Sequence, residues 1–243
     1  MGGSCRPLSF PGAGMFPIRD TIRSRAVPFI TYALITLNLL VYLFQSSLTP
    51  QSSTLFIQSF GLTPAQFSLQ NPFGFVTIFS SMFMHGSWFH VISNMWILFI
   101  FGDNVEDRMG SVRYLVFYLL AGIFAALTHV YFSPRLAVPT VGASGAVAGV
   151  LGAYFLLFPR ARVLTFIPLF IFPWFIEVPA LIFLGVWFLS QLANGLMFGG
   201  IAMGGIAWWA HIGGFAFGFV TARFFIPRRR LPAPAGRDPW TYR

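Results

Sequence analysis

The amino-acid sequence predicts an all-α membrane protein that crosses the bilayer six times. Two bulk properties indicate this class: 56% of the 243 residues are hydrophobic and only 9% are charged, whereas roughly 25% of the residues in a soluble domain are charged. The third observation is the length of the apolar stretches, since a bilayer core of about 30 Å takes about 20 apolar residues per helix. Six stretches approach that length, at residues 28–48, 75–102, 113–132, 143–159, 177–198 and 206–226.

The six stretches define a membrane domain over residues 28–226, with a tail on each side. Residues 1–27 contain arginines but no apolar core that ends in a cleavage site, so we predict a cytoplasmic tail without a removed signal peptide. Residues 227–243 form a basic tail that we expect to be disordered near anionic lipid. The single cysteine, Cys5, lies in the first tail, so no intramolecular disulfide can form.

Two connecting segments and one short stretch stand out within the domain. Residues 49–71 are polar and uncharged, too long for a tight turn, and expected to fold onto the membrane surface. Residues 163–178 are apolar but contain Pro168 and Pro173, which predicts an irregular or interfacial hairpin and not a seventh span. The stretch 143–159 is short for a bilayer, so a helix that starts at Gly142 would begin below the outer surface.

The arginines predict how the bundle is oriented. All 15 basic residues are arginines, and those near span ends fall on one side of the predicted bundle, with only Arg135 opposite. Short cytoplasmic loops carry the excess of positive charge, so both termini are predicted to be cytoplasmic and segments 49–71 and 199–205 to face outward. Because the arginines do not form one basic face, the net charge of +9 indicates a lipid bilayer and not nucleic acid as partner.

Four polar side chains inside the predicted spans are candidates for function: His90, Asn94, Ser144 and His211. Polar groups are costly in lipid and usually face the interior of a bundle. His90 and Asn94 are four residues apart and share a helix face, whereas His85 is expected to point elsewhere. Hydrogen bonds between helices are the simpler interpretation of such a pair.

Ser144 and His211 have the chemistry of a nucleophile and its base. Ser144 lies between Gly142 and Gly145 at the start of the fourth stretch, and a serine there is most often only a helix cap. The free N–H groups and the positive dipole end of the helix would also stabilise an oxyanion beside it. His211, in the middle of an apolar helix, is either an ordinary interior group or a neutral imidazole that accepts a proton.

Small residues predict that the fourth and sixth stretches pack closely. Glycines recur along both, at Gly145, Gly149 and Gly152 and at Gly214 and Gly218. Helices with such small-xxx-small faces approach each other closely in membranes. This packing would bring Ser144 and His211 within the roughly 3 Å that base-assisted attack requires.

The sequence resembles the rhomboid family of intramembrane serine proteases over roughly residues 28–226. The resemblance is carried by His85-Gly-x-x-His90-x-x-x-Asn94, by Gly142-Ala-Ser144-Gly145 and by His211-x-x-Gly214-x-x-x-Gly218. It implies a six-helix bundle in which Ser144 and His211 form a dyad. It also implies an oxyanion hole made by Asn94, His90 and the backbone N–H of Ser144.

The resemblance further implies what the protein acts on. Substrates would be transmembrane segments of other membrane proteins, cleaved near small residues and admitted past a mobile fifth helix and a capping loop at 199–205. Glu106 matches a family position with a structural role. Two features depart from the family: Ala148 replaces an aromatic residue that stacks on the histidine in some members, and the first outer loop lacks a Trp-Arg pair. The orientation of His211 is therefore left to other groups.

Three other functions remain as alternatives. A metal or haem site would use His85, His90 and His211, but no His-Glu-x-x-His motif and no intramembrane carboxylate supports it, so we expect no metal and no cofactor. A transporter would need repeats or acids for ion coupling, and neither is seen. A catalytically silent binder of transmembrane helices would not need Ser144 or His211.

The same absence of acids argues against a third triad member, since no aspartate lies in any span. The minimal size without an extra soluble domain suggests the plasma membrane of a bacterium.

Overall fold

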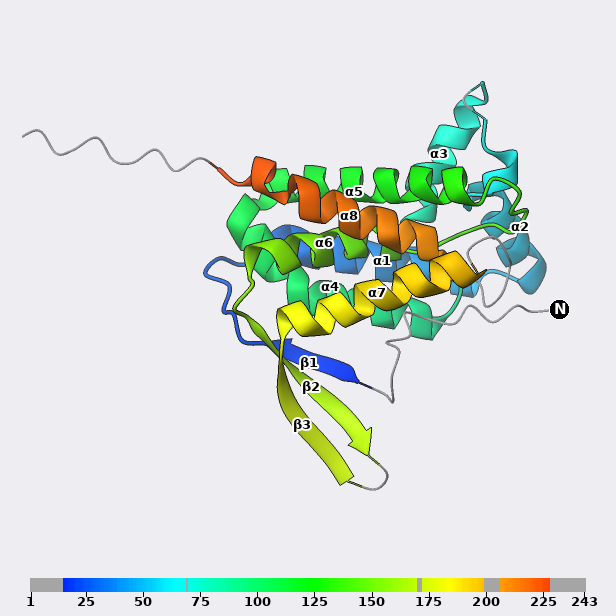
Figure 1. Ribbon diagram of the computed structural model, residues 1–243. Helices are drawn as coiled ribbons and strands as arrows, with labels where there is room; N and C mark the ends of the chain where they lie inside the picture. The colour runs from blue at the N-terminus through cyan, green and yellow to red at the C-terminus, as the bar shows by residue number, and fades with distance from the viewer. Residues whose placement is uncertain (1–14, 69, 170–171, 199–205, 228–243) are drawn as a thin grey trace, which may run out of the picture.

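The computed structural model describes residues 15–68, 70–169, 172–198 and 206–227. Helices make up most of this part of the chain and lie side by side as a bundle, with a small sheet beside one end (Figure 1). The predicted capping loop at 199–205, Cys5 and almost all of the C-terminal tail lie outside the described residues.

Each predicted span contains a helix. Among the described residues, three helices are long and apolar enough to cross a membrane by length and composition: α1 (Phe29–Ser47), α5 (Ser111–Phe132) and α7 (Ala180–Phe198). The other three helices of the bundle are α4 (Trp88–Met109), α6 (Ser144–Leu157) and α8 (Trp208–Phe225). The expected shortness of the fourth helix is confirmed, because α6 has 14 residues. The count of six membrane spans stays a prediction.

The predicted span at 75–102 is not one helix. Helix α3 (Pro72–Ser81) ends within it, and α4 begins only at Trp88. The side chain of Ser87 caps α4 by accepting a hydrogen bond from the backbone N–H of His90. His85 therefore lies in the connection and not on a helix. Its ring lies edge-on to that of His90, with ring centroids 5.0 Å apart, so the expectation that His85 points elsewhere was wrong.

The polar segment 49–71 folds into short helices at the end of the bundle away from the sheet (Figure 1). They are α2 (Pro50–Phe60) and a 3-10 turn, η1 (Pro64–Gln66). Helix α2 starts with proline at its first position after Thr49, whose hydroxyl accepts a hydrogen bond from the N–H of Ser52. Just after α2, Leu62 exchanges backbone hydrogen bonds with Thr140, and this bridge reaches the segment that leads into α6.

The fold also contains a sheet, which corrects the all-α prediction. Its strands are β1 (Phe16–Asp20), β2 (Arg162–Leu169) and β3 (Phe172–Pro179), antiparallel and in the order β1-β2-β3. The hairpin expected at 163–178 is present, but it is regularly paired and not irregular, because aromatic and β-branched residues favour strands. Strand β1 belongs to the predicted tail 1–27, so this part of the tail is joined to the domain.

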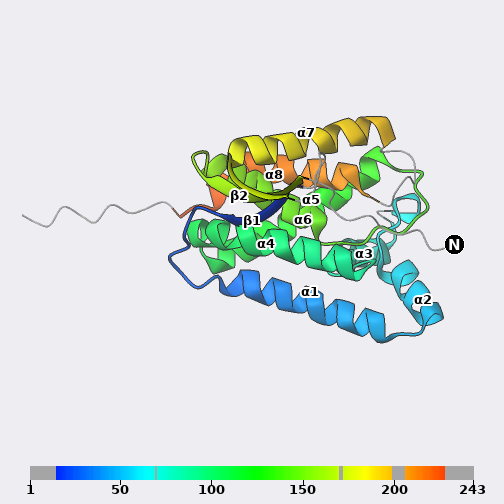
Figure 2. The same ribbon diagram turned by 90° about the horizontal axis from the view of Figure 1, so that it is seen from below.

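Helix α6 lies at the centre of the bundle. Every residue from Ser144 to Tyr154 is buried, and α6 packs most extensively against α8. A Cβ atom on Gly214 would overlap the carbonyl oxygen of Gly145, and one on Gly218 would overlap that of Gly149. The close glycine packing expected between these two helices is therefore observed. Helices α7 and α1 lie on opposite flanks of the bundle (Figure 2).

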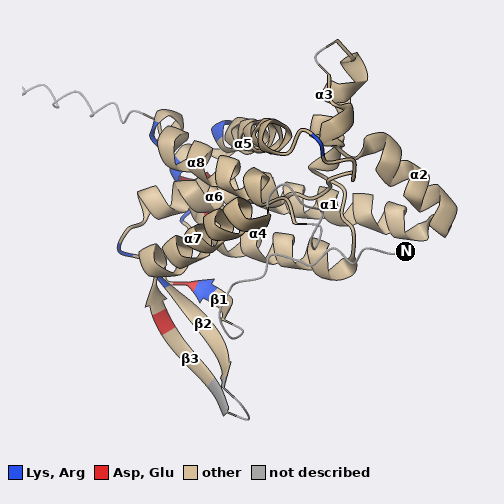
Figure 3. Ribbon diagram, turned by 45° about the vertical axis from the view of Figure 1, so that its right-hand side comes forward, with Lys and Arg blue, Asp and Glu red and all other residues tan. Residues whose placement is uncertain are grey.

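Basic residues gather at one end of the bundle. Figure 3 shows them near the sheet and at the ends of the helices there. Arg135 comes three residues after the end of α5, a helix that runs away from the end with the sheet (Figure 1). The asymmetry from which we predict the orientation is thus a feature of the folded molecule.

Candidate functional site

Ser144 and His211 meet between the first turns of α6 and α8. The hydroxyl oxygen of Ser144 lies 2.8 Å from Nε2 of His211, which is hydrogen-bond distance. Both side chains are buried, with exposed fractions of 9% and 3%. His211 is the fourth residue of α8 and not in the middle of the helix, because α8 begins at Trp208. Two residues that are 67 positions apart in sequence are thus in contact.

The hydroxyl of Ser144 is not a helix cap. The cap position of α6 is Ala143, and no side chain caps this helix. Ser144 is the first helical residue, whose backbone N–H has no acceptor within the helix. Its hydroxyl is free to interact with the imidazole, and its N–H is free to interact with a ligand.

Three contacts hold the backbone of residues 140–143, the segment before Ser144. Besides the bridge to Leu62, the N–H of Gly142 donates to the carbonyl oxygen of Ser81 at 2.9 Å. The N–H of Ala143 lies 3.5 Å from Nε2 of His85. His85 therefore contacts the backbone segment that leads into Ser144.

Gly142 is needed for two reasons. Its φ of +138° is a conformation that residues with a side chain rarely adopt. A Cβ atom there would also lie 2.8 Å from Cε1 and 2.9 Å from Nε2 of His90, and 3.7 Å from the hydroxyl oxygen of Ser144. A side chain at position 142 would therefore collide with the ring of His90, which lies against the backbone that leads into Ser144.

Asn94, one turn after His90 on α4, is buried without a side-chain hydrogen bond to any described residue. Its exposed fraction is 0%, and neither of its amide atoms has a partner among the described residues. An unpaired buried polar group costs about 1–3 kcal/mol, so such groups are uncommon and often mark functional sites. Asn94 and His90 lie one turn apart on α4, as the sequence predicts.

Gln191 of α7 lies on the other side of His211. Its Oε1 atom is 2.8 Å from Nδ1 of His211. The rings of Trp187 and Trp208 also lie beside the imidazole, with ring centroids 6.0 and 6.4 Å from it. These groups, and not position 148, surround the histidine. The sequence analysis missed Gln191, although a glutamine inside an apolar stretch satisfies the same criterion as the histidines.

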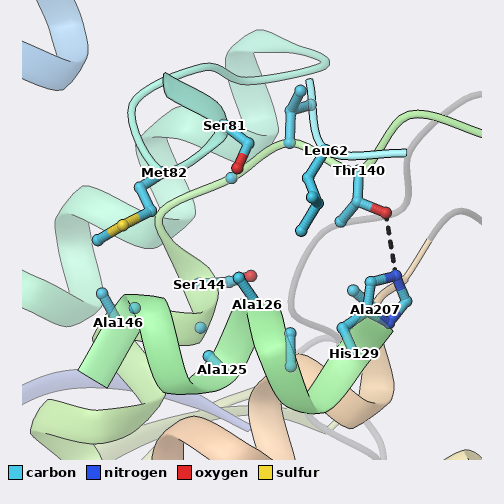
Figure 4. A pocket seen from close by; sticks show the side chains of 15 residues that line it. Leu62, Ser81, Met82, Ala125, Ala126, His129, Thr140, Ser144, Ala146 and Ala207 are labelled. Atoms are coloured by element: carbon cyan, nitrogen blue, oxygen red, sulfur yellow. Dashed lines mark hydrogen bonds between the residues drawn. The ribbon is translucent and has the colours of Figure 1, made fainter. Parts of the chain in front are cut away.

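A small cavity opens beside Ser144 (Figure 4). Its volume is about 30 Å³, which accommodates a water molecule or a small apolar group. Its wall is partly apolar, with Met82 and Ala126, and partly polar, with His129 and Thr140. Nε2 of His129 and the hydroxyl oxygen of Thr140 are 3.0 Å apart. His129 was also missed in the sequence, although it lies in a predicted span.

The histidines do not form a cluster of metal ligands. Within the described residues, no three histidine, cysteine or acidic side chains are placed to hold a metal ion. His85 and His90 contact each other, whereas His211 is engaged by Ser144 and Gln191. The arrangement offers acid–base chemistry at a serine instead.

The fold and the site define a helical membrane protein with a buried serine–histidine pair. Comparison with known families gives the same class, because residues 72–228 match the Rhomboid domain. The chain belongs to the rhomboid family.

Several curated proteins are similar to the chain. Rhomboid protein 1, mitochondrial, of Saccharomyces cerevisiae is 31% identical over 173 residues, which are 67% of this chain and 46% of that protein. Presenilin-associated rhomboid-like protein, mitochondrial, of Bos taurus is 31% identical over 137 residues, 54% of this chain and 34% of that protein. Rhomboid protease GluP of Bacillus subtilis is 31% identical over 126 residues, 52% of this chain and 24% of that protein.

The chain matches less than half the length of each of these relatives. One of them is named a protease, and two are named mitochondrial. Their names support a membrane protein of the rhomboid family, but they do not support the plasma membrane of a bacterium as its location.

Proposed function

We propose that the protein is an intramembrane serine endopeptidase that cleaves transmembrane segments of other membrane proteins. The observation that carries this proposal is the 2.8 Å contact between the hydroxyl of Ser144 and Nε2 of His211. Nucleophile and base within hydrogen-bond reach are the minimum for covalent catalysis by serine.

In the first step, the hydroxyl oxygen of Ser144 attacks the carbonyl carbon of the scissile peptide bond while Nε2 of His211 takes its proton. His211 then returns this proton to the leaving amine, and the acyl group stays on Ser144. A water molecule activated by His211 releases the acyl group and restores the serine. Ser144 and His211 do this without an acidic third residue, because the imidazole needs only to be held in the correct orientation.

The oxyanion that forms during attack needs hydrogen-bond donors on the other side of Ser144. Asn94 supplies its unpaired amide, His90 its ring Nε2, and Ser144 its own backbone N–H at the positive end of α6. Because Gly142 has no side chain, the ring of His90 can lie against the backbone beside Ser144. This role explains why Asn94 is buried without a partner.

The cavity beside Ser144 supports a preference for small side chains at the cleavage site. At about 30 Å³, it accepts a methyl group more readily than a large side chain. Its polar wall, with His129 and Thr140, would bind a water molecule while no substrate side chain fills the cavity.

The site fits a bundle of six spans with both termini on the cytoplasmic side. The arginine-rich end with the sheet would face the cytoplasm. The first turns of α6 and α8 are directed toward the other end, where water can reach Ser144 from outside. Access of an impermeant maleimide to Cys5 and to a second cysteine placed at Gly236 tests this topology, and reaction of the two from opposite sides of the membrane would contradict it.

The proposal is tested by cleavage of a single-pass reporter protein in proteoliposomes. The reporter carries alanine at the scissile position, and a second version carries tryptophan there. We expect the parent to cleave only the first version. We expect Ser144→Ala to cleave neither, whereas Ser46→Ala, which removes an exposed hydroxyl on α1, cleaves like the parent.

Two results would refute the proposal. One is cleavage that persists in Ser144→Ala. The other is a folded parent that binds the reporter without cutting it, which would favour a silent binder of transmembrane helices.

A further inference from the structure

Gln191 is one of the most deeply buried polar residues near the site. Its exposed fraction is 1%, and it lies on α7, a helix of which only 28% is buried by the rest of the molecule. A polar side chain on such a helix could satisfy itself by a hydrogen bond to the carbonyl groups of its own helix. Gln191 instead reaches across to α8, with Oε1 2.8 Å from Nδ1 of His211.

The neighbours of Gln191 fix which end of its amide faces the histidine. Its Nε2 atom donates to the hydroxyl oxygen of Ser190 at 3.2 Å. The hydroxyl of Ser190 in turn donates to the carbonyl oxygen of Trp187 at 2.6 Å, so it must accept from Gln191. The carbonyl oxygen of Gln191, which can only accept, is therefore the atom that faces His211.

An acceptor opposite Nδ1 determines the tautomer of His211. A neutral imidazole carries one proton, and the nitrogen without it is the acceptor. With the proton held on Nδ1 by Gln191, Nε2 is unprotonated and can accept the proton of Ser144. The opposite tautomer would direct an N–H at the Ser144 hydroxyl and could not act as its base.

We propose that Gln191 is a positioning residue that holds His211 in the tautomer and orientation needed to act as base for Ser144. The inference rests on the proposed function, since the base is that of the protease reaction. Gln191 takes the place that an aspartate has in a Ser-His-Asp triad, but as a neutral group.

A neutral acceptor suits the location of this site. A carboxylate at the same place would be a buried charge on a helix that crosses lipid, which is expensive. An amide supplies the orientation without that penalty, although it cannot stabilise the imidazolium by charge. We therefore expect Gln191 to matter for the rate, but less than His211 itself.

Three variants isolate this role. Gln191→Met keeps the length of the side chain and removes the acceptor, whereas Gln191→Glu keeps an acceptor oxygen whether or not it is ionised. Asn194→Leu is the matched control, because Asn194 lies on the same helix and its side chain donates to the backbone of Ser190, a contact outside the site. In detergent, we measure the rate at which a fluorophosphonate probe labels each variant.

We expect Gln191→Met to label about 10–100-fold more slowly than the parent, part of the 10²–10⁴-fold that a general base contributes. Gln191→Glu should stay within about ten-fold of the parent, and Asn194→Leu should match it. Equal rates for Gln191→Met and the parent would overturn the proposal. So would a loss that Gln191→Glu does not recover.

The second readout is the tautomer of His211, measured from the ring nitrogen shifts of protein labelled with ¹⁵N-histidine. The signals of His211 are identified by their absence in His211→Ala. We expect one neutral tautomer with the proton on Nδ1 in the parent, and a mixture or the other tautomer in Gln191→Met.

An unchanged tautomer in Gln191→Met would overturn the proposal. This readout needs no turnover, so it decides the role of Gln191 even if the parent shows no serine reactivity. Failure of the positioning role is thereby separated from failure of the protease function.

Discussion

Asn94 and Asn38 show what burial of the same residue type can mean. Both are fully buried, each on a helix of the bundle. The amide of Asn38 donates to the carbonyl oxygen of Leu34 within its own helix, at 2.7 Å. Asn94 has no partner at all among the described residues. The amide nitrogen of Asn38 is thus satisfied within its own helix, whereas both amide atoms of Asn94 are left without a partner, as the proposed oxyanion role requires.

Replacing Asn94 by alanine should therefore reduce activity without reducing stability. We expect Asn94→Ala to cleave the reporter about 10²–10³-fold more slowly, the usual loss on removal of one oxyanion donor. Its melting temperature should equal or exceed that of the parent, because no hydrogen bond is lost. Asn38→Ala is the control and should show the opposite pattern. A variant of Asn94 that melts early and cleaves normally would assign it a structural role.

At the scale of elements, the pairing of α6 with α8 places Ser144 next to His211. The two helices approach so closely that the positions of Gly214 and Gly218 have no room for a Cβ atom. At both positions the nearest atoms of the facing helix are backbone atoms. A change of side-chain rotamer could therefore not make room for a larger residue.

A methyl group at Gly218 should separate the two helices. It would meet the backbone of Gly149, and overpacking of this kind costs about 1–3 kcal/mol. We expect Gly218→Ala to lower the melting temperature and to lower fluorophosphonate labelling. In Gly185→Ala, on α7, the new methyl would have only an ordinary contact at 3.8 Å, so this variant should melt like the parent or later. Equal melting of the two variants would contradict the packing argument.

Helix α7 is less tightly held than α6 or α8, yet it carries Gln191. A displacement of α7 from α8 would break the contact with His211. Helix α7 therefore contributes a side chain that contacts His211 directly.

The sequence predicts these elements unevenly. Long apolar stretches predict helices at all six places, and glycine spacing predicts that α6 meets α8. The break between α3 and α4 is missed because no charged residue interrupts residues 75–102, while the start of α4 is set by local capping at Ser87. Gln191 is missed because its partner, His211, comes from a separate helix, and nothing local indicates the contact.

At the scale of the whole molecule, the sheet joins the N-terminal segment to the segment that follows α6, the helix that carries Ser144. Phe16 pairs with Phe166, a contact between distant parts of the chain that local patterns cannot predict. At the end of β1, a carboxylate oxygen of Asp20 accepts hydrogen bonds from the hydroxyl of Tyr154, on α6, and from the side chain of Asn104, on α4. The sheet is thus connected to the two helices that carry Ser144 and Asn94.

Asp20 should make this connection dependent on pH. Burial raises the pKa of Asp20 from its usual 3.8 to about 6, although the hydrogen bond from Tyr154 opposes this shift. Because the folded state holds the proton more tightly than the unfolded state, the stability contributed by this carboxyl falls as the pH rises from about 4 to about 6.

The Asp20→Asn variant should lack that dependence. We expect the difference in melting temperature between Asp20→Asn and the parent to move in favour of the variant as the pH is raised from 4 to 7, and to change little above that. Melting curves of Asp20→Asn and of the parent, recorded at several pH values between 4 and 8, measure this difference. A difference that is constant with pH would show that Asp20 has the same pKa in the folded and unfolded states.

The central claim is that Ser144 is a nucleophile activated by His211, and fluorophosphonate labelling of the purified protein tests it most directly. We predict that the parent is labelled at Ser144, that labelling vanishes in Ser144→Ala and that it is lost or nearly lost in His211→Ala. A folded parent that takes no label, or His211→Ala labelled as fast as the parent, would contradict the claim.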